Sequence, residues 1–183
     1  MTKILIGIAA VVIGWIVYTY NRLVTLRMRA NEAVSDIDVQ TKRRYDLIPN
    51  LVESVKGYMQ HERNVLENVT KARTEAMGIS GSVLEREGKE NVLSGALKTL
   101  FAVAENYPQL KANENFLELQ RELTDTEDKI QAARRFYNAT VRDLNTKIQV
   151  FPASIVAKTF GFSEMKFFEV SSEAEREPIK VKF

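Results

Sequence analysis

The most regular pattern in this chain lies in NENFLELQRELTDTEDKIQAARRFYNATVRDLNTKIQVF, residues 113–151. Apolar or aromatic side chains recur there at every seventh position, which is the spacing of a continuous stripe along an α-helix. The helix would be about 57 Å long at about 1.5 Å per residue, too long for a compact globule of this size. We therefore predict an all-α, elongated, antiparallel up-and-down bundle. The core seam of this helix is predicted to comprise Phe116, Leu123, Ile130, Tyr137, Leu144 and Phe151.

A second apolar seam precedes it, in residues 22–76, where two rows of positions seven apart run side by side. This pattern is typical of antiparallel bundles and coiled coils. The seam fails at residues 40–45, and Pro49 lacks the N–H that a helix interior requires, so we predict a kink or break at residues 45–49.

Turn signals divide the rest of the bundle. The glycine-containing segment MGISGS, residues 77–82, predicts a loop, and Ser82 with Glu85 fits a capping box, although Gly88 suggests that the regular helix begins only near residue 89. Pro108 is expected to end that helix. About four helices result. The predicted organisation is an anchor at 1–21, a long-helix bundle at 22–151, a short helix with an apolar aromatic segment at 152–170, and a polar, mobile tail at 171–183.

The N-terminal segment ILIGIAAVVIGWIVYTYN, residues 4–21, contains no charge. As a helix its apolar part would be about 25 Å long, slightly short of the ~30 Å hydrocarbon core. We interpret it as an uncleaved membrane span, with a cleaved signal peptide and a buried core helix as the alternatives. Its aromatic residues suit the headgroup region, and its small residues would allow two spans to approach closely. The span residues singled out are Ile4, Gly7, Ala10, Gly14, Trp15, Tyr18 and Tyr20.

Basic residues flank this segment unequally. Lys3 precedes it alone, whereas Arg22, Arg27 and Arg29 follow it. The positive-inside rule predicts a single-pass protein with its N-terminus outside and its bundle in the cytoplasm, the alternative being a periplasmic bundle. These three arginines would lie within about 12 Å of the bilayer and are predicted to attract anionic lipid.

Composition excludes several kinds of site. The chain has 183 residues, no cysteine and one histidine, so a disulfide, a thiol nucleophile and a multi-histidine metal site are ruled out. With a formal net charge of +2 the chain lacks the concentrated positive field that nucleic-acid binding requires. The acidic residues Glu122, Asp125, Glu127 and Asp128 are interpreted as a solvated helix face. We expect no cofactor, no metal and no nucleic-acid partner.

Polar and helix-breaking residues cluster near the predicted kink and on the last helices. A buried network of arginines and carboxylates that sets helix register is the favoured interpretation, ahead of contacts between protomers. An active site is the least favoured, because no nucleophile, glycine-rich phosphate loop or metal spacing accompanies these residues. The residues are Asp36, Asp38, Arg43, Arg44, Asp46, Pro49, Asn50, Asn113, Asn115, Arg134, Arg135, Tyr137 and Asn138.

After residue 151 the sequence becomes FPASIVAKTFGFSEMKFFEV, in which Pro152 can start a short helix and Gly161 can end it. Two interpretations of this aromatic segment stay open. It either folds back to cover the end of the bundle, or it contacts another protomer or a membrane surface. The residues concerned are Phe160, Phe162, Phe167 and Phe168.

Three long motifs resemble the LemA family of bacterial membrane-anchored proteins: SDIDVQTKRRYDLIPNLVESVKGYMQHE, AVAENYPQLKANENFLELQREL and RRFYNATVRDLNTKIQVFPASIVAKTFGF. The resemblance covers roughly residues 4–168. It implies one N-terminal transmembrane helix in the bacterial inner membrane, carrying an antiparallel bundle of about four helices, and it implies no enzyme activity. One branch of the family is associated with magnetosome membranes.

The sequence therefore predicts a membrane-anchored helical scaffold without catalysis, which forms homo-oligomers and organises or shapes the bilayer. The alternative, from another class, is a membrane adaptor that recruits a protein partner such as a protease, a phosphatase or a signalling protein.

Overall fold

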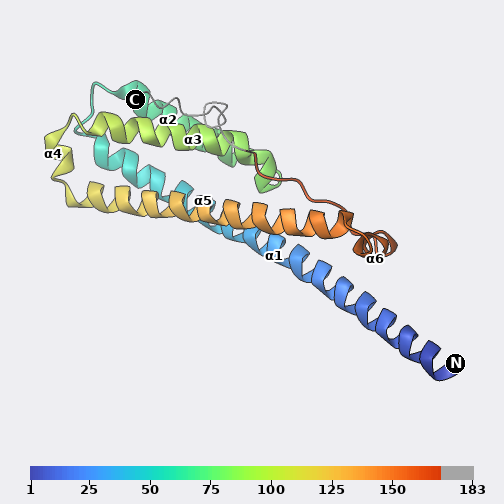
Figure 1. Cartoon of the computed structure of the whole chain (residues 1–183). Helices are drawn as coiled ribbons and strands as arrows, with labels where there is room; N and C mark the ends of the chain where they lie inside the picture. Colours follow the sequence, from blue (N-terminus) through green and yellow to red (C-terminus); the bar gives the residue numbers. More distant parts are fainter. Residues whose placement is uncertain (170–183) are drawn as a thin grey trace, which may run out of the picture. The chain divides into compact units, whose positions relative to one another are not determined.

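The computed structural model describes residues 1–169, so the predicted polar tail lies outside the described residues. The described part consists of six α-helices and contains no strand, which confirms the all-α fold class (Figure 1). The helices are α1 (Thr2–Lys56), α2 (Arg63–Met77), α3 (Val83–Ala104), α4 (Pro108–Lys111), α5 (Glu114–Gln149) and α6 (Ala153–Thr159).

The chain folds into two compact units, and the helices α1 and α5 each contribute to both. The N-terminal unit comprises Met1–Ser35 and Ala133–Phe167. Of the described residues, the bundle unit comprises Asp36–Ala132 together with Phe168 and Glu169.

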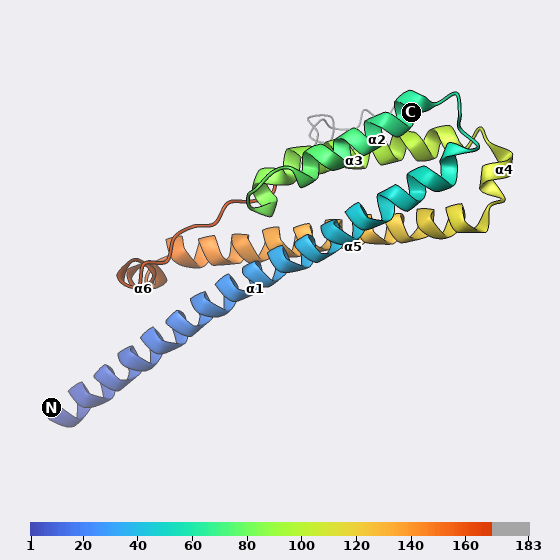
Figure 2. The same ribbon diagram turned by 180° about the vertical axis from the view of Figure 1, so that it is seen from behind.

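Four long helical segments form the bundle unit, and consecutive segments run in opposite directions (Figure 2). Each presents a row of apolar side chains, and these rows meet in one core. The core includes Leu51 of α1, Val69 of α2, Leu97 of α3 and Leu123 of α5, all buried. The bundle predicted from the seven-residue periodicity is therefore present, because each row of apolar residues buries one face of its helix in the same core.

The break predicted at residues 45–49 is absent, because α1 continues through Pro49 and ends at Lys56. A proline at this position leaves the carbonyl of Tyr45, four residues earlier, without its helical donor. The side chain of Arg73 on α2 supplies the donor: its Nε lies 2.7 Å from the Tyr45 carbonyl oxygen. A tertiary hydrogen bond therefore replaces the missing backbone bond, and the chain instead turns at residues 57–62.

The other boundaries follow their local signals. The loop between α2 and α3 falls at residues 78–82, as predicted, and the Glu85 carboxylate accepts the Ser82 backbone N–H at 3.1 Å. Helix α3 begins at Val83, so the later start expected from Gly88 is wrong. Pro108 follows the end of α3 and opens α4. The Asn113 side chain caps α5 by accepting the Phe116 N–H at 3.1 Å.

In the N-terminal unit, α6 folds against the parts of α1 and α5 that belong to this unit. Ala157 of α6 is buried together with Leu23, Leu26, Leu144 and Ile148. Helix α6 ends at Thr159, and Gly161 follows with a φ of 69°, which is accessible to glycine at little cost. The Phe162 N–H bonds to the Ala157 carbonyl at 2.9 Å, which completes a glycine-terminated C-cap.

The core seam predicted for α5 needs one correction. Phe116, Leu123, Ile130, Tyr137 and Leu144 are buried, whereas Phe151 is 81% exposed. Helix α5 ends at Gln149, so the chain has already turned when it reaches residue 151 and the helical stripe no longer determines where that side chain points.

Candidate functional site

The first feature with functional meaning is the apolar start of α1. Its large side chains from Ile4 to Tyr18 are exposed or nearly so, and only 6% of the most apolar 18-residue window is buried. By length and composition this helix can cross a membrane. The low burial argues against the core-helix alternative, because a core helix of a soluble protein is covered by its own chain.

A sharp boundary ends the exposed segment. Thr19 and Leu23 are buried, so the protein's own packing begins where the apolar run stops. Trp15, Tyr18 and Tyr20 stay partly exposed just before or at that boundary. Arg22, Arg27 and Arg29 follow it, and all three are exposed. The segment therefore ends in an aromatic belt and a basic flank, the order expected at a membrane-water interface.

Charge is distributed unequally between the two units. The N-terminal unit contains ten basic and three acidic side chains, a formal charge of +7. Residues 36–132 of the bundle unit contain thirteen basic and seventeen acidic side chains, a formal charge of −4. The small net charge of the whole chain therefore conceals a basic unit that includes the apolar helix.

The second feature is a buried ionic cluster in the bundle unit, centred on Arg44. Its guanidinium pairs with the carboxylates of Glu90 on α3 and Glu127 on α5. It also donates to the Ser94 hydroxyl at 2.9 Å, and that hydroxyl donates to Glu127 at 3.0 Å. Arg44 and Glu90 are almost fully buried, so α1, α3 and α5 are held together by charge-assisted hydrogen bonds.

Tyr45 extends this cluster, because its hydroxyl donates to the other oxygen of Glu90. Burial, the hydrogen bond to Glu90 and the charge of that carboxylate all raise the pKa of Tyr45 well above its usual value. The phenol therefore stays protonated and keeps donating at neutral and moderately alkaline pH. The cluster joins three helices through buried charge-assisted hydrogen bonds, and this geometry fits a structural role.

The sequence predicted Arg44 as part of a polar network but missed its partners. Glu127 is not a member of a solvated face, since it pairs with Arg44. Glu122 is likewise engaged, 3.6 Å from Arg43. The sequence does contain a signal for Glu90. Glu87 and Glu90 continue the apolar row of α3 that includes Leu93 and Leu97. A charged residue in such a row must be paired when it is buried.

The other residues named for the polar network have different environments. Asp38 pairs with Arg86 across the bundle unit, and the Asn113 amide donates to the Tyr58 hydroxyl at 3.2 Å. Arg134 is buried and Asn138 is half-buried, each with an interaction of its own. The remaining named residues are exposed: Asp36, Asp46, Pro49, Asn50, Asn115 and Arg135.

Two polar side chains of α5 hold the segment after α6 in the N-terminal unit. The Tyr137 hydroxyl donates to the Lys166 carbonyl at 2.9 Å. The Asn145 amide bonds both backbone groups of Met165, at 2.9 and 3.0 Å. These bonds place an extended segment along α5, which the periodicity of α5 alone does not reveal.

The aromatic segment after α6 divides into covered and open residues. Phe168 is buried and Phe162 is half-buried, whereas Phe160 and Phe167 are exposed. Tyr20 lies against two of these rings, with centroid distances of 4.8 Å to Phe160 and 5.8 Å to Phe162. Part of the segment is therefore covered by the chain's own packing and part of it faces outward.

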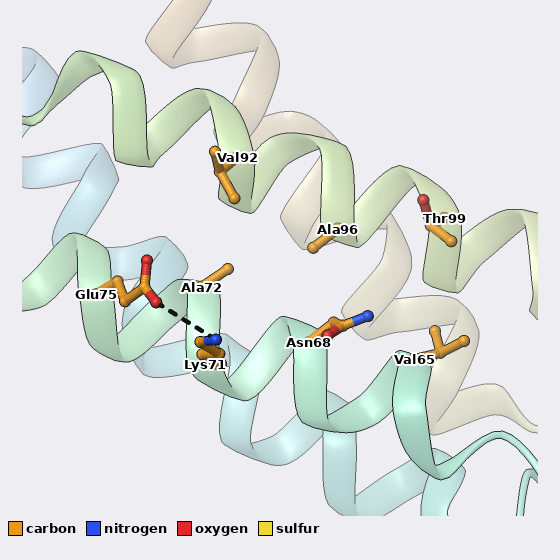
Figure 3. A pocket seen from close by; sticks show the side chains of 8 residues that line it. All are labelled: Val65, Asn68, Lys71, Ala72, Glu75, Val92, Ala96 and Thr99. Carbon is orange, nitrogen blue, oxygen red and sulfur yellow. Dashed lines mark ion pairs between the residues drawn. The ribbon is translucent and has the colours of Figure 1, made fainter.

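Two grooves in the bundle unit lie beside α2. A groove of about 400 Å³ lies between α2 and α3, with Ala72, Val92 and Ala96 among the residues lining it (Figure 3). A larger groove, of about 1140 Å³, lies between the end of α1 and α2. Among residues 1–169 no three His, Asp or Glu side chains converge as a metal site would require.

Fold and surface together define a class: an all-helical protein with one N-terminal helix apolar enough to cross a membrane. The model of the LemA family matches residues 33–183. The chain belongs to the LemA family, as its motifs indicate. Protein LemA of Metamycoplasma hominis is 30% identical over 159 residues, covering 85% of this chain and 71% of that protein.

Magnetosome proteins are also related. MamQ 1 and MamQ 2 of Paramagnetospirillum magneticum are each 25% identical over 182 residues, covering 86% of this chain and 67% of the relative. MamQ of Magnetospirillum gryphiswaldense is 25% identical over 174 residues, covering 81% of this chain and 64% of that protein.

Proposed function

We propose that this chain is a membrane-anchored helical scaffold that self-associates and thereby organises or shapes the bacterial inner membrane, without catalysis. The observation that carries the proposal is the exposed apolar start of α1, which ends where the protein's own packing begins. The names of the magnetosome relatives support a role in a specialised cell structure.

The mechanism is geometric. Chains held in one bilayer meet at high effective concentration, so contacts that are weak in solution become sufficient for assembly. In this proposal the bundle units supply the rigid spacing, and the basic N-terminal units hold anionic lipid beneath the assembly. The buried Arg44 cluster serves this role by fixing the register of three bundle helices, which a scaffold of defined spacing requires.

The flanks of the span set the proposed orientation. Basic residues close to a span favour the cytoplasmic side, and here Arg22, Arg27 and Arg29 follow the span whereas Lys3 alone precedes it. We therefore place the N-terminus outside the inner membrane and the bundle unit in the cytoplasm, with a periplasmic bundle as the alternative.

One association surface is the small-residue face of the span. A Cβ built at Gly7 or Gly14 meets no atom within 4 Å, so this face is open to a second helix. In the full chain reconstituted in lipid, Gly7→Leu with Gly14→Leu should weaken the oligomer if this face is used. Val12→Leu, on the opposite face, is the matched control and should leave the oligomer unchanged.

The test is the mass of the full-length protein in lipid nanodiscs or mild detergent, measured over a range of protein concentrations. The proposal predicts a large oligomer, with crosslinks between identical positions of neighbouring chains. A monodisperse monomer at every concentration would refute self-association while leaving membrane anchoring intact.

The second candidate function is a membrane adaptor, and the groove between α1 and α2 is the observation that favours it. Its lining mixes apolar and charged side chains, including Val52, Leu66, Lys56 and Glu67. Such a groove suits an amphipathic helix of a partner. An adaptor would stay monomeric or dimeric in lipid and would enrich one defined partner on crosslinking.

A further inference from the structure

Apolar side chains remain exposed at a second place in the N-terminal unit, apart from the span. Phe151 is 81% exposed, Ile155 of α6 is 58% exposed and Phe160 is 52% exposed. We refer to these three residues as the α6 surface. They are large, and they cluster within ten residues of sequence at the end of α5 and around α6. Such clusters mark an interaction site more often than isolated surface residues do.

Ring contacts place the α6 surface at the level where the span ends. The Tyr20 ring lies 4.8 Å from the Phe160 ring, and Tyr20 is the last residue of the apolar run. On the same side of α6, Ala157 is buried against Leu23 and Leu26, in the next turns of α1. Helix α6 is therefore fixed beside the end of the span, and Phe160 adjoins the segment that the proposed function places in lipid.

The charge around the α6 surface favours lipid over a protein as its binding partner. Lys158 of α6 and Arg22 of α1 are both exposed near these aromatic residues, and the whole unit has a formal charge of +7. Apolar and aromatic side chains beside cations are typical of elements that lie in the headgroup region of an anionic bilayer. Two copies meeting through this surface would bring like charges together, which disfavours that arrangement.

We propose that the α6 surface inserts into the interface of the same bilayer that α1 crosses, so that each chain contacts the membrane at two points. This inference rests on the proposed membrane anchor and adds to it. A second contact beside the span fixes the rotation of α1 about its axis and the angle at which the N-terminal unit meets the bilayer. A span alone leaves both of these free.

The absence of cysteine makes the test direct, because a single introduced cysteine can carry a nitroxide spin label. Labels are placed at Ile155→Cys, at Val12→Cys in the span and at Lys98→Cys on the exposed face of α3. Each full-length protein is reconstituted in vesicles that contain phosphatidylcholine and phosphatidylglycerol. Accessibility is measured to oxygen, which concentrates in lipid, and to a water-soluble nickel chelate.

The inference predicts that the label at residue 155 is more accessible to oxygen than to nickel, as at residue 12, while residue 98 shows the reverse. A water-exposed label at 155 with a lipid-exposed label at 12 would overturn the inference and leave the anchor intact. A label at 155 shielded from both reagents, with broadening between neighbouring labels, would overturn it in favour of a protomer contact. A water-exposed label at 12 would refute the anchor itself.

A variant tests whether the side chains cause the insertion. Phe151→Ser with Phe160→Ser, in the chain labelled at residue 155, should shift that label toward the nickel-accessible range. Both positions are exposed, so the fold should persist, and circular dichroism checks this. Val39→Ser with Val92→Ser, two exposed apolar residues of the bundle unit, is the matched control and should leave the label unmoved. An unchanged label in the Phe151 and Phe160 variant would contradict a role for these side chains.

Discussion

At the scale of single residues, the bundle unit depends on a charge inside its core. Arg44 lies in the position of an apolar seam residue, seven after Ile37 and seven before Leu51. Its burial is tolerable only because Glu90, Glu127 and Ser94 surround the guanidinium. The row of apolar residues is therefore interrupted in the sequence at the position where three helices are joined.

Replacing this arginine should be costly. Arg44→Met leaves a buried carboxylate without its cation, and we expect it to lower the free energy of unfolding by about 3 kcal/mol. Arg43→Met is the matched control, because Arg43 is half-exposed and 3.6 Å from Glu122, and it should cost about 1 kcal/mol or less. Thermal unfolding followed by circular dichroism measures both. Equal losses for the two variants would contradict a structural role for the cluster.

Tyr45 makes the stability contributed by the same cluster depend on pH. Its pKa is raised in the folded protein, so above about pH 10 the unfolded chain releases this proton while the folded chain keeps it. Stability that is fully present below that pH should therefore fall as the pH rises further. Tyr45→Phe should cost about 1–3 kcal/mol at neutral pH through the lost hydrogen bond to Glu90.

Comparing melting temperatures of the two proteins at about pH 8 and about pH 11 isolates the titration. The wild type should lose more stability over this interval than Tyr45→Phe does. Tyrosinate absorbance at the higher pH offers an independent check. Because Tyr45 should stay protonated in the folded wild type, the wild type and Tyr45→Phe should show the same tyrosinate absorbance. An identical loss in both proteins would mean that Tyr45 does not keep its proton.

At the scale of elements, local sequence signals predicted several helix boundaries correctly and others wrongly. The loop at residues 78–82, the cap at Asn113 and the end of α6 just before Gly161 follow from residue chemistry within a few positions. The continuity of α1 through Pro49 does not, because it depends on Arg73 of another helix supplying a donor to the Tyr45 carbonyl. Periodicity tells which face of a helix is buried, but not which helix faces it.

The partners of Arg44 illustrate the same limit. Glu90 and Glu127 are 46 and 83 residues away in sequence, and no local rule connects them with Arg44. Two glutamates in the apolar row of α3 were the available hint. The predictions for the span and its basic flank are different in kind. They depend only on residue composition and on order along the chain, and both can be read directly from the sequence.

Glycine substitutions test the account of helix ends. Gly161→Ala puts a Cβ on a residue with φ of 69°, and it should destabilise the N-terminal unit by about 1 kcal/mol. Gly95→Ala, in the exposed interior of α3, meets no atom within 4 Å and should stabilise the chain by about 0.5–1 kcal/mol. Opposite signs in the melting temperature are the expected result. Stabilisation by both would contradict the assigned C-cap.

At the scale of the whole molecule, apolar surface and charge belong to the same part of the chain. The N-terminal unit has the exposed apolar helix, the α6 surface and a formal charge of +7, while residues 36–132 have a formal charge of −4. A protein that acts through shape at a membrane needs such a division between a lipid-facing part and a soluble part. In our proposal the acidic bundle units are kept from the anionic bilayer, which leaves their surfaces available to other copies or partners.

The most direct measurement of the central claim is the accessibility of two single cysteines in intact bacterial cells. Thr2→Cys lies at the start of α1, and Thr124→Cys is exposed on α5 in the bundle unit. After permeabilisation of the outer membrane alone, a membrane-impermeant thiol reagent should label residue 2 and leave residue 124 unlabelled until the inner membrane is lysed. Labelling of both residues before lysis would contradict a chain whose N-terminal helix crosses the inner membrane and whose bundle remains in the cytoplasm.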